Sequence, residues 1–163
     1  MDNVEELENI CQDILKLDPK MRSSRFINAR GHLTAGGMKD GLLSLEAQKQ
    51  DEMMFMELAL RVRMRHEFDT EFGIVHFSLS YRDKVIVMSF PLSNDDVLLV
   101  SREKDKNFEE IPFKILELIE AKFFRISRVF LEICILVAVV ITFLHNIGSA
   151  IQCHSVLNIV HVL

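Results

Sequence analysis

The chain has 163 residues, of which 49% are hydrophobic and 26% charged, so it can build one folded domain with an appendage. Its net charge of -5, with no basic stripe to offset it, argues against a nucleic-acid partner. The widely spaced Cys11, Cys134 and Cys153 lack the pattern of a disulfide framework, and the acidic N-terminus lacks that of a secretory signal.

The first part of the chain predicts a helix followed by a hairpin. Apolar residues at helical spacing predict a helix over residues 3–17, which Pro19 ends. Residues 23–30 and 32–36 then predict two short strands. Gly31 allows a tight turn between them, because glycine accepts a positive φ, and a loop follows from Gly36 to Leu45.

This hairpin contains the one glycine-rich segment of the chain, "RGHLTAGGMKDG" at residues 30–41. Gly31 and Gly36 are spaced like the first two glycines of a phosphate-binding loop, and Lys39 follows closely. Such a loop also needs a helix directly after its last glycine and a Ser or Thr after its lysine. Here Asp40 follows Lys39, and the next predicted helix begins several residues later. The segment therefore favours a hairpin over a nucleotide site.

A second helix is predicted over residues 47–68, with an unusually wide apolar surface. Beside one apolar stripe, formed by Phe55, Ala59 and Val62, the helix carries a second one, which consists of Met53, Met56, Leu60 and Met64. This arc is wider than one sheet face requires, and methionine suits an adaptable contact. Two interpretations stay open: a buried core helix, or a helix that packs against a partner.

Three strands and a last helix complete the domain. Residues 74–81 alternate as in a half-buried strand, 84–90 are apolar on both faces as in a central strand, and 96–102 predict a third. Residues 107–124 predict the last helix. The predicted fold class is therefore α+β, in the order α-β-β-α-β-β-β-α. Its five-stranded sheet is antiparallel, because short hairpins join the strands.

No arrangement of residues predicts catalysis or a bound cofactor. His32, His66 and His76 fall on different elements and show no metal-ligand spacing, and neither do the histidines and Cys153 of the tail. Cys11 lies on the apolar face of the first helix without a base beside it. We therefore predict a protein that is not an enzyme and binds no metal or cofactor.

The C-terminal part predicts a membrane anchor. No Lys, Arg, Asp or Glu follows Glu132, and residues 126–144 have about the length and apolar character of a membrane span. Lysines and arginines precede this run and none follows it, which predicts a cytoplasmic N-terminal domain; the alternative is a buried core helix. The predicted organisation is a domain over 1–122, a single transmembrane helix over 123–145 and an apolar tail over 146–163. The anchor residues expected in this arrangement are Phe123, Phe124, Arg125, Arg128, Leu136, Val140 and Leu144.

The element order, with the hairpin "FINARGHLTAGG" after an N-terminal helix, resembles the roadblock/dynein-light-chain group of the profilin-like and longin-like folds. The chain is also similar to an uncharacterised archaeal family built on this plan. The resemblance covers roughly residues 4–122. It implies a homodimer that pairs through the central helix and the strand after it, and a small Ras-like GTPase as partner. The interface implied here consists of Met53, Met56, Leu60 and Met64 with Val75 and Phe77 nearby.

Two function hypotheses follow. The first is a non-enzymatic, membrane-anchored module for dimerisation or scaffolding, serving a small Ras-like GTPase. The alternative is a cytoplasmic sensor domain that binds a small molecule at the membrane, which requires a cavity lined by polar groups. Because the strand residues that face the helices are predicted to be apolar, the sequence favours the first hypothesis.

Overall fold

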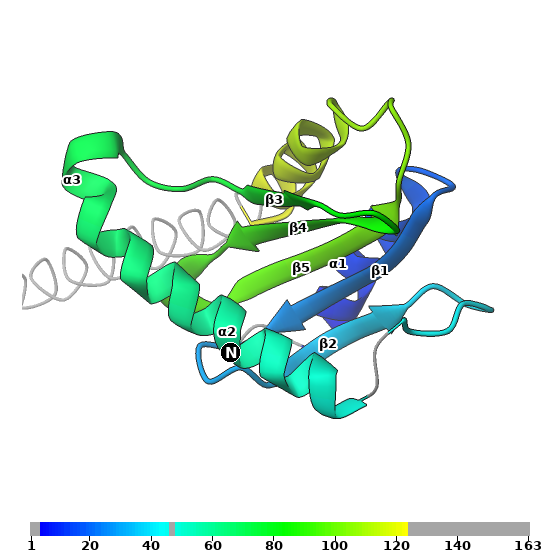
Figure 1. Cartoon of the computed structure of the whole chain (residues 1–163), viewed down its shortest axis with the longest axis horizontal. Coiled ribbons are helices and arrows are strands. Elements are labelled where there is room, and N and C mark those ends of the chain that lie inside the picture. The colour runs from blue at the N-terminus through cyan, green and yellow to red at the C-terminus, as the bar shows by residue number, and fades with distance from the viewer. Residues whose placement is uncertain (1–3, 46–47, 124–163) are drawn as a thin grey trace, which may run out of the picture. The chain divides into compact units, whose positions relative to one another are not determined.

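The computed structural model describes residues 4–45 and 48–123, and the elements up to Glu120 form one compact unit. Figure 1 shows their arrangement. In chain order they are α1 (Val4–Lys16), β1 (Met21–Ile27), β2 (Leu33–Met38), α2 (Gln48–Arg65), the 3-10 helix η1 (His66–Phe68), α3 (Asp69–Phe72), β3 (Ser78–Tyr81), β4 (Val85–Pro91), the 3-10 helix η2 (Ser93–Asp95), β5 (Val97–Glu103) and a helix over 111–123.

The five strands form one antiparallel sheet in the order β2-β1-β5-β4-β3, which confirms the predicted sheet. The chain builds it from the hairpin β1–β2 and the three-stranded meander β3–β4–β5, and joins them where β1 pairs with β5. In Figure 1, α2 crosses one face of the sheet, while α1 and the helix that begins at residue 111 cover the other. The two edges of the sheet are therefore β2 and β3.

The core has two layers because strand side chains alternate between the two faces. On the α2 side, Phe55, Leu58 and Val62 pack against Ile27, Val97 and Leu99. The alternate positions of β5, Leu98 and Val100, are equally buried. The two covering helices of that second face bury apolar residues at helical spacing, namely Ile10 and Ile14 of α1 and Ile111, Ile115 and Ile119 of the last helix.

Around α2, two element boundaries differ from the sequence prediction. The helix predicted over 47–68 ends at Arg65, and the chain continues through η1 into the short helix α3, which was not predicted. Gly73, at φ +80°, ends α3 in a conformation that favours glycine. Only Ser78–Tyr81 of the strand predicted over 74–81 pairs with β4. Residues 74–77 return the chain from α3 to the sheet edge instead of pairing with β4.

Two other boundaries differ from the sequence prediction. β2 continues to Met38, so Gly36 and Gly37 lie within the strand rather than in a loop. The last helix begins at residue 111 instead of 107, as expected for Pro112, which has no amide hydrogen and is tolerated in the first helical turn. Neither change alters the order of the strands.

Buried polar side chains within the strands correct the expectation of purely apolar sheet faces. Arg25 of β1 is buried, pairs with Asp51 of α2 at 3.3 Å and stacks over the ring of Phe55. The hydroxyls of Ser23 and Ser101 form a hydrogen bond of 2.6 Å between β1 and β5. These contacts satisfy polar groups that would otherwise be costly to bury.

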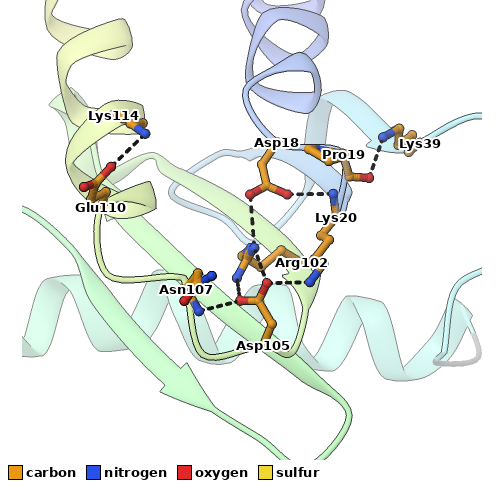
Figure 2. Close-up of polar contacts among 9 residues, drawn as sticks. All are labelled: Asp18, Pro19, Lys20, Lys39, Arg102, Asp105, Asn107, Glu110 and Lys114. Carbon is orange, nitrogen blue, oxygen red and sulfur yellow. Dashed lines mark hydrogen bonds and ion pairs between the residues drawn. The ribbon is translucent and has the colours of Figure 1, made fainter.

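A second buried arginine holds one end of the sheet together (Figure 2). Arg102 at the end of β5 is 1% exposed and bonds Asp105 at 2.8 Å and Asp18 at 3.1 Å. Hydrogen bonds from Arg102 and then from Lys20 lower the pKa of the Asp105 carboxyl. The network thus ties the end of β5 to the segment that links α1 to β1.

The predicted transmembrane helix falls, apart from Phe123, beyond the part of the chain that the structure describes. Within residues 4–45 and 48–123, no helix has the length and apolar character needed to cross a membrane.

Candidate functional site

The outer face of α2 carries a continuous apolar surface. Met53, Met56, Leu60 and Met64 are 58% to 65% exposed, while Phe55, Ala59 and Val62 on the inner face are buried against the sheet. The four outer side chains form the stripe predicted from the sequence. Of the two interpretations left open, a stripe buried in the core is excluded for this unit, because these side chains are more than half exposed. We call these four residues the α2 stripe.

The α2 stripe does not stop at Met64. Phe68 in η1 and Phe72 in α3 follow at intervals of four residues and are 57% and 84% exposed. Their rings pair with a centroid separation of 6.3 Å. Sequence reasoning placed Phe68 in the helix without giving it a role and missed Phe72 because α3 was not predicted. The four-residue spacing from Leu60 through Met64, Phe68 and Phe72 was the signal that could have revealed both.

The structure does not bring all six predicted interface residues together. Val75 is half-buried and lines a hollow with Val62 and Arg65, on the α2 side. Phe77 packs instead against Phe90 and Phe113, at 6.0 and 5.5 Å between ring centroids. Since Phe113 belongs to the last helix, the Phe77 ring faces away from α2. Val75 is thus near the end of the helix, whereas the Phe77 side chain is separated from the α2 stripe by the sheet.

Polar contacts fix the C-terminal end of α2 to two turns of the sheet. The imidazole of His66 lies between Asp69 of α3, at 2.7 Å, and Asp95 of η2, at 3.1 Å. Arg63 also contacts Asp95, at 3.6 Å, and donates a hydrogen bond of 2.5 Å to the carbonyl of Ala29 in the β1–β2 turn. The hydrogen bonds with Asp69 and then with Asp95 raise the pKa of His66. These contacts set the position of η1 and α3 at the end of the α2 stripe.

The glycine-rich segment supports the placement of α2 and forms no phosphate loop. Gly31 takes φ +78° in the β1–β2 turn, and a Cβ there would lie 2.8 Å from the Cα of Met56. This close approach lets the turn sit directly against α2. Lys39, the lysine of the apparent motif, donates its Nζ hydrogen bond to the carbonyl of Pro19 at 2.9 Å (Figure 2). The sequence preference for a hairpin is confirmed by the β1–β2 pairing.

The described residues offer little chemistry for catalysis. Burial raises the pKa of the Cys11 thiol to about 11, so the reactive thiolate is scarce at neutral pH. Among the described histidines, cysteines and acids, no group of three is placed to hold a metal ion. The two nitrogens of His66 point to carboxylates on opposite sides of its ring, which is an ion-pair arrangement and not a ligand set.

One groove lies between β2 and α2, where the alternative sensor function would need a ligand. Its walls include Arg25, Leu33, Asp51 and Met56. Two of its charged groups pair with each other, since Arg25 bonds Asp51 and stacks on Phe55, and Glu52 and His32 also line it. The buried arginine of the groove is therefore already neutralised by a side chain of the protein.

Comparison with known proteins gives one matching family model and several solved structures with a similar fold. The model of a family of unknown function, DUF6659, matches residues 1–126. No curated protein is significantly similar in sequence. Among solved structures, the chain is similar to a roadblock/LC7 domain from Streptomyces avermitilis, with a TM-score of 0.56 and 11% identity over 74% of this chain and 98% of that one.

Two further structures resemble the chain to the same degree. The gliding protein MglB from Thermus thermophilus gives a TM-score of 0.58 at 7% identity, covering 73% of this chain and 89% of its own. MglB from Myxococcus xanthus gives 0.57 at 11% identity, covering 76% and 91%. The described domain therefore has a roadblock/LC7-like fold, as the resemblance in its sequence implied. The likeness to an archaeal family stays a prediction.

Proposed function

Because the chain belongs to the DUF6659 family of unknown function, we propose a role from its own surface: a non-enzymatic module that pairs two copies through the α2 stripe and serves as a scaffold. One observation carries this proposal. Four large apolar side chains stand exposed along one face of α2. A contiguous apolar patch of this kind marks an interaction site, because water contact with it is unfavourable.

The composition of the α2 stripe suits pairing between copies. Three of its four side chains are methionines, which are unbranched and adapt to the surface opposite. Burying each such side chain contributes about 1.5 to 3 kcal/mol before the cost of association. Four from each subunit are thus enough to support a dimer. The likeness to roadblock/LC7 structures, which the sequence resemblance connects with pairing through the central helix, supports the same choice of face.

We propose further that the C-terminal residues 123–145 hold this module at a membrane, with the domain on the cytoplasmic side and a small Ras-like GTPase as its partner. The charge-free run after Glu132 supports the anchor. The GTPase partner is supported by the similarity of the fold to roadblock domains. An argument from fold is weaker than an argument from the geometry of a binding site. A pull-down with residues 1–122 tests the GTPase partner. The native extract is loaded with either GDP or a GTP analogue. Enrichment of a Ras-like protein in a nucleotide-dependent way supports the GTPase, and its absence in both states contradicts it.

Sedimentation equilibrium of residues 1–122 at roughly tens of micromolar tests the dimer, since weak pairs are populated in this range. We expect the wild-type domain to be dimeric. Met56→Glu or Leu60→Glu should weaken pairing by about 100-fold or more, because the new carboxylate loses its water against an apolar surface. Circular dichroism should stay unchanged, since both positions are exposed.

Val4→Glu is the matched control, because Val4 is 57% exposed but lies at the start of α1. This variant should remain dimeric. A monomeric wild-type domain would overturn the proposal. Dimers that persist in both α2 variants would show that the interface lies on another surface.

A further inference from the structure

We propose that α3 inserts into the surface of the membrane that holds the anchor, through the exposed side chains of Phe68, Phe72 and Ile74, which we call the α3 wedge. This inference rests on the proposed membrane anchor and adds which part of the domain meets the lipid. The surface that receives the α3 wedge is the boundary between the headgroups and the acyl chains of a bilayer.

Packing within the folded unit does not account for the α3 wedge. Phe68, Phe72 and Ile74 are 57%, 84% and 67% exposed. None of the residues of η1 and α3, all of which the structure describes, is buried. The two rings pair with each other at 6.3 Å between centroids and still remain exposed. Apolar surface of this kind is stabilised when another apolar phase covers it.

The last helix runs toward the end of the sheet where α3 lies. The ring of Phe108, just before this helix, lies 5.4 Å from that of Tyr81 at the end of β3. The ring of Phe113, in the first turn, lies 5.5 Å from that of Phe77, just before β3 begins. The helix then extends about 10 Å further to Glu120, at 1.5 Å per residue. α3 ends five residues before Phe77 and so lies within about 18 Å of it. The chain thus leaves the folded unit at the end that carries α3 (Figure 1).

This end of the domain is also the part nearest to the proposed anchor along the chain. The anchor is proposed over residues 123–145, which begin three residues after Glu120. So short a connection holds this end at the bilayer surface, where aromatic and large aliphatic side chains are favoured. The acidic neighbours, Glu67 and Glu71, are exposed and stay among the hydrated headgroups. Insertion therefore depends on apolar burial and not on attraction to anionic lipids.

The fold holds the α3 wedge in a fixed shape before it meets the lipid. His66 bonds Asp69, at the start of α3, at 2.7 Å, and Asp95 of η2 at 3.1 Å. The amide of Gly73 bonds the carbonyl of Asp69 at 3.0 Å, which closes α3 after Phe72. A turn fixed by these contacts loses little conformational freedom on insertion, which lowers the cost of binding.

Tryptophan fluorescence of the full chain tests this inference, because the sequence contains no tryptophan. Phe72→Trp places a single reporter in the α3 wedge. The variant is reconstituted into vesicles of phosphatidylcholine, with or without bromine atoms on the acyl chains. We expect emission at a shorter wavelength than from the denatured chain, and loss of most of it to bromine near the headgroups. Bromine near the chain ends should quench less, since interfacial segments lie only about 5–10 Å into the boundary.

Leu43→Trp is the matched control, because Leu43 is 86% exposed and lies at the opposite end of the sheet. Its carbonyl accepts a hydrogen bond from Arg22, which also contacts Glu103 of β5. Glu103 pairs with the first residue of β4, whereas Phe77 packs against Phe90 near its last. Bromine should leave the emission of this control unchanged. Equal quenching of both reporters would overturn the inference, because no particular end of the domain would then face the lipid.

Three other outcomes separate this inference from the proposed anchor. If the chain is recovered with the vesicles but the Phe72→Trp reporter is not quenched, the α3 wedge is wrong and the anchor stands. Shifted emission without quenching would show that protein covers the ring, and would also overturn the inference. If the full chain is not recovered with the vesicles, the anchor and the inference both fail.

Variants in the Phe72→Trp background check the driving force. Phe68→Glu with Ile74→Glu should abolish the quenching, because carboxylates resist transfer from water, whereas Glu71→Gln should preserve it. Salt at about 1 M, which shortens the Debye length to about 3 Å, should leave the quenching unchanged. Quenching that is lost in salt would indicate electrostatic adsorption. Quenching that persists in the double glutamate variant would show that other residues carry the reporter into the lipid. Either result would overturn the inference.

Discussion

Gly36 shows how a single missing side chain supports the packing of α1 on the sheet. It takes φ +82° within β2, and a Cβ there would lie 2.2 Å from the carbonyl oxygen of Ser24 and 2.5 Å from the Sγ of Cys11. Neither neighbour has room to move, because both are buried. The residue is thus required for two separate reasons, its backbone conformation and the space around it.

Gly36→Ala should therefore lower the free energy of unfolding by about 3 kcal/mol, the sum of a left-handed backbone cost and an overpacking cost. Gly41→Ala is the matched control. Gly41 has nearly the same φ, +79°, but nothing within 4 Å of its added Cβ, so this variant should lose only about 1 kcal/mol. Urea unfolding of residues 1–122 measures both. Equal losses in the two variants would show that packing against Cys11 contributes nothing.

At the scale of elements, the contacts at the end of α2 depend on the charge of His66. The two carboxylates that contact His66 raise its pKa above the ordinary value of 6.5. A raised pKa in the folded state means that this contribution to stability is fully present below about pH 6.5 and is lost as the pH rises through the folded pKa. The contacts of α3 and η2 with α2 are consequently stronger in mildly acidic solution.

His66→Gln should lower stability more at about pH 5.5 than at about pH 9, because the contribution of the charged imidazole is lost as the pH rises through the folded pKa. His76→Gln is the control, because His76 is also an exposed histidine but lies between α3 and β3. Thermal unfolding of both variants and the wild type at the two pH values gives the difference. A His66→Gln effect that is independent of pH would contradict a charged contact.

The elements with strong periodicity were predictable from the sequence, and the exceptions have local causes. The α2 stripe follows from the 3.6-residue repeat, and its exposure was left open because periodicity cannot distinguish a partner from a second core layer. α3 is a single turn, too short to be recognised as a separate helix from its own residues. The alternation at 74–77 did not yield a strand, because these residues connect α3 to the sheet edge and Ile74 is exposed.

Buried arginines were the second kind of exception. A charged residue in a strand usually indicates a solvent-facing position. Arg25 is neutralised by Asp51 of α2, and Arg102 by Asp18, in the segment between α1 and β1, and by Asp105, three residues further along the chain. The pairings with Asp51 and Asp18 depend on the assembled fold and leave no local pattern. The residues of the α2 stripe were thus predictable from the periodicity of a helix. Contacts between different elements were not predictable.

At the scale of the whole molecule, the folded unit and the apolar C-terminal segment should behave differently in solution. We expect the full chain to partition with membranes and residues 1–122 to stay in the aqueous phase, because every Lys, Arg, Asp and Glu lies at or before Glu132. Fractionation with and without detergent measures this. Full-length protein in the aqueous fraction without detergent would contradict the anchor.

The carboxylate of Glu8 has a consequence for assembly. In the edge strand β2, the amide of Gly36 points away from β1 and donates a hydrogen bond of 2.8 Å to Glu8 Oε1 of α1. An added strand would have to displace that carboxylate, so one side of the sheet resists extension by another chain. A sheet that extends from copy to copy needs two free edge strands on every copy, and in this molecule the contact with Glu8 blocks one of them. Copies that meet through α2 should accordingly stop at a closed pair instead of continuing into fibres.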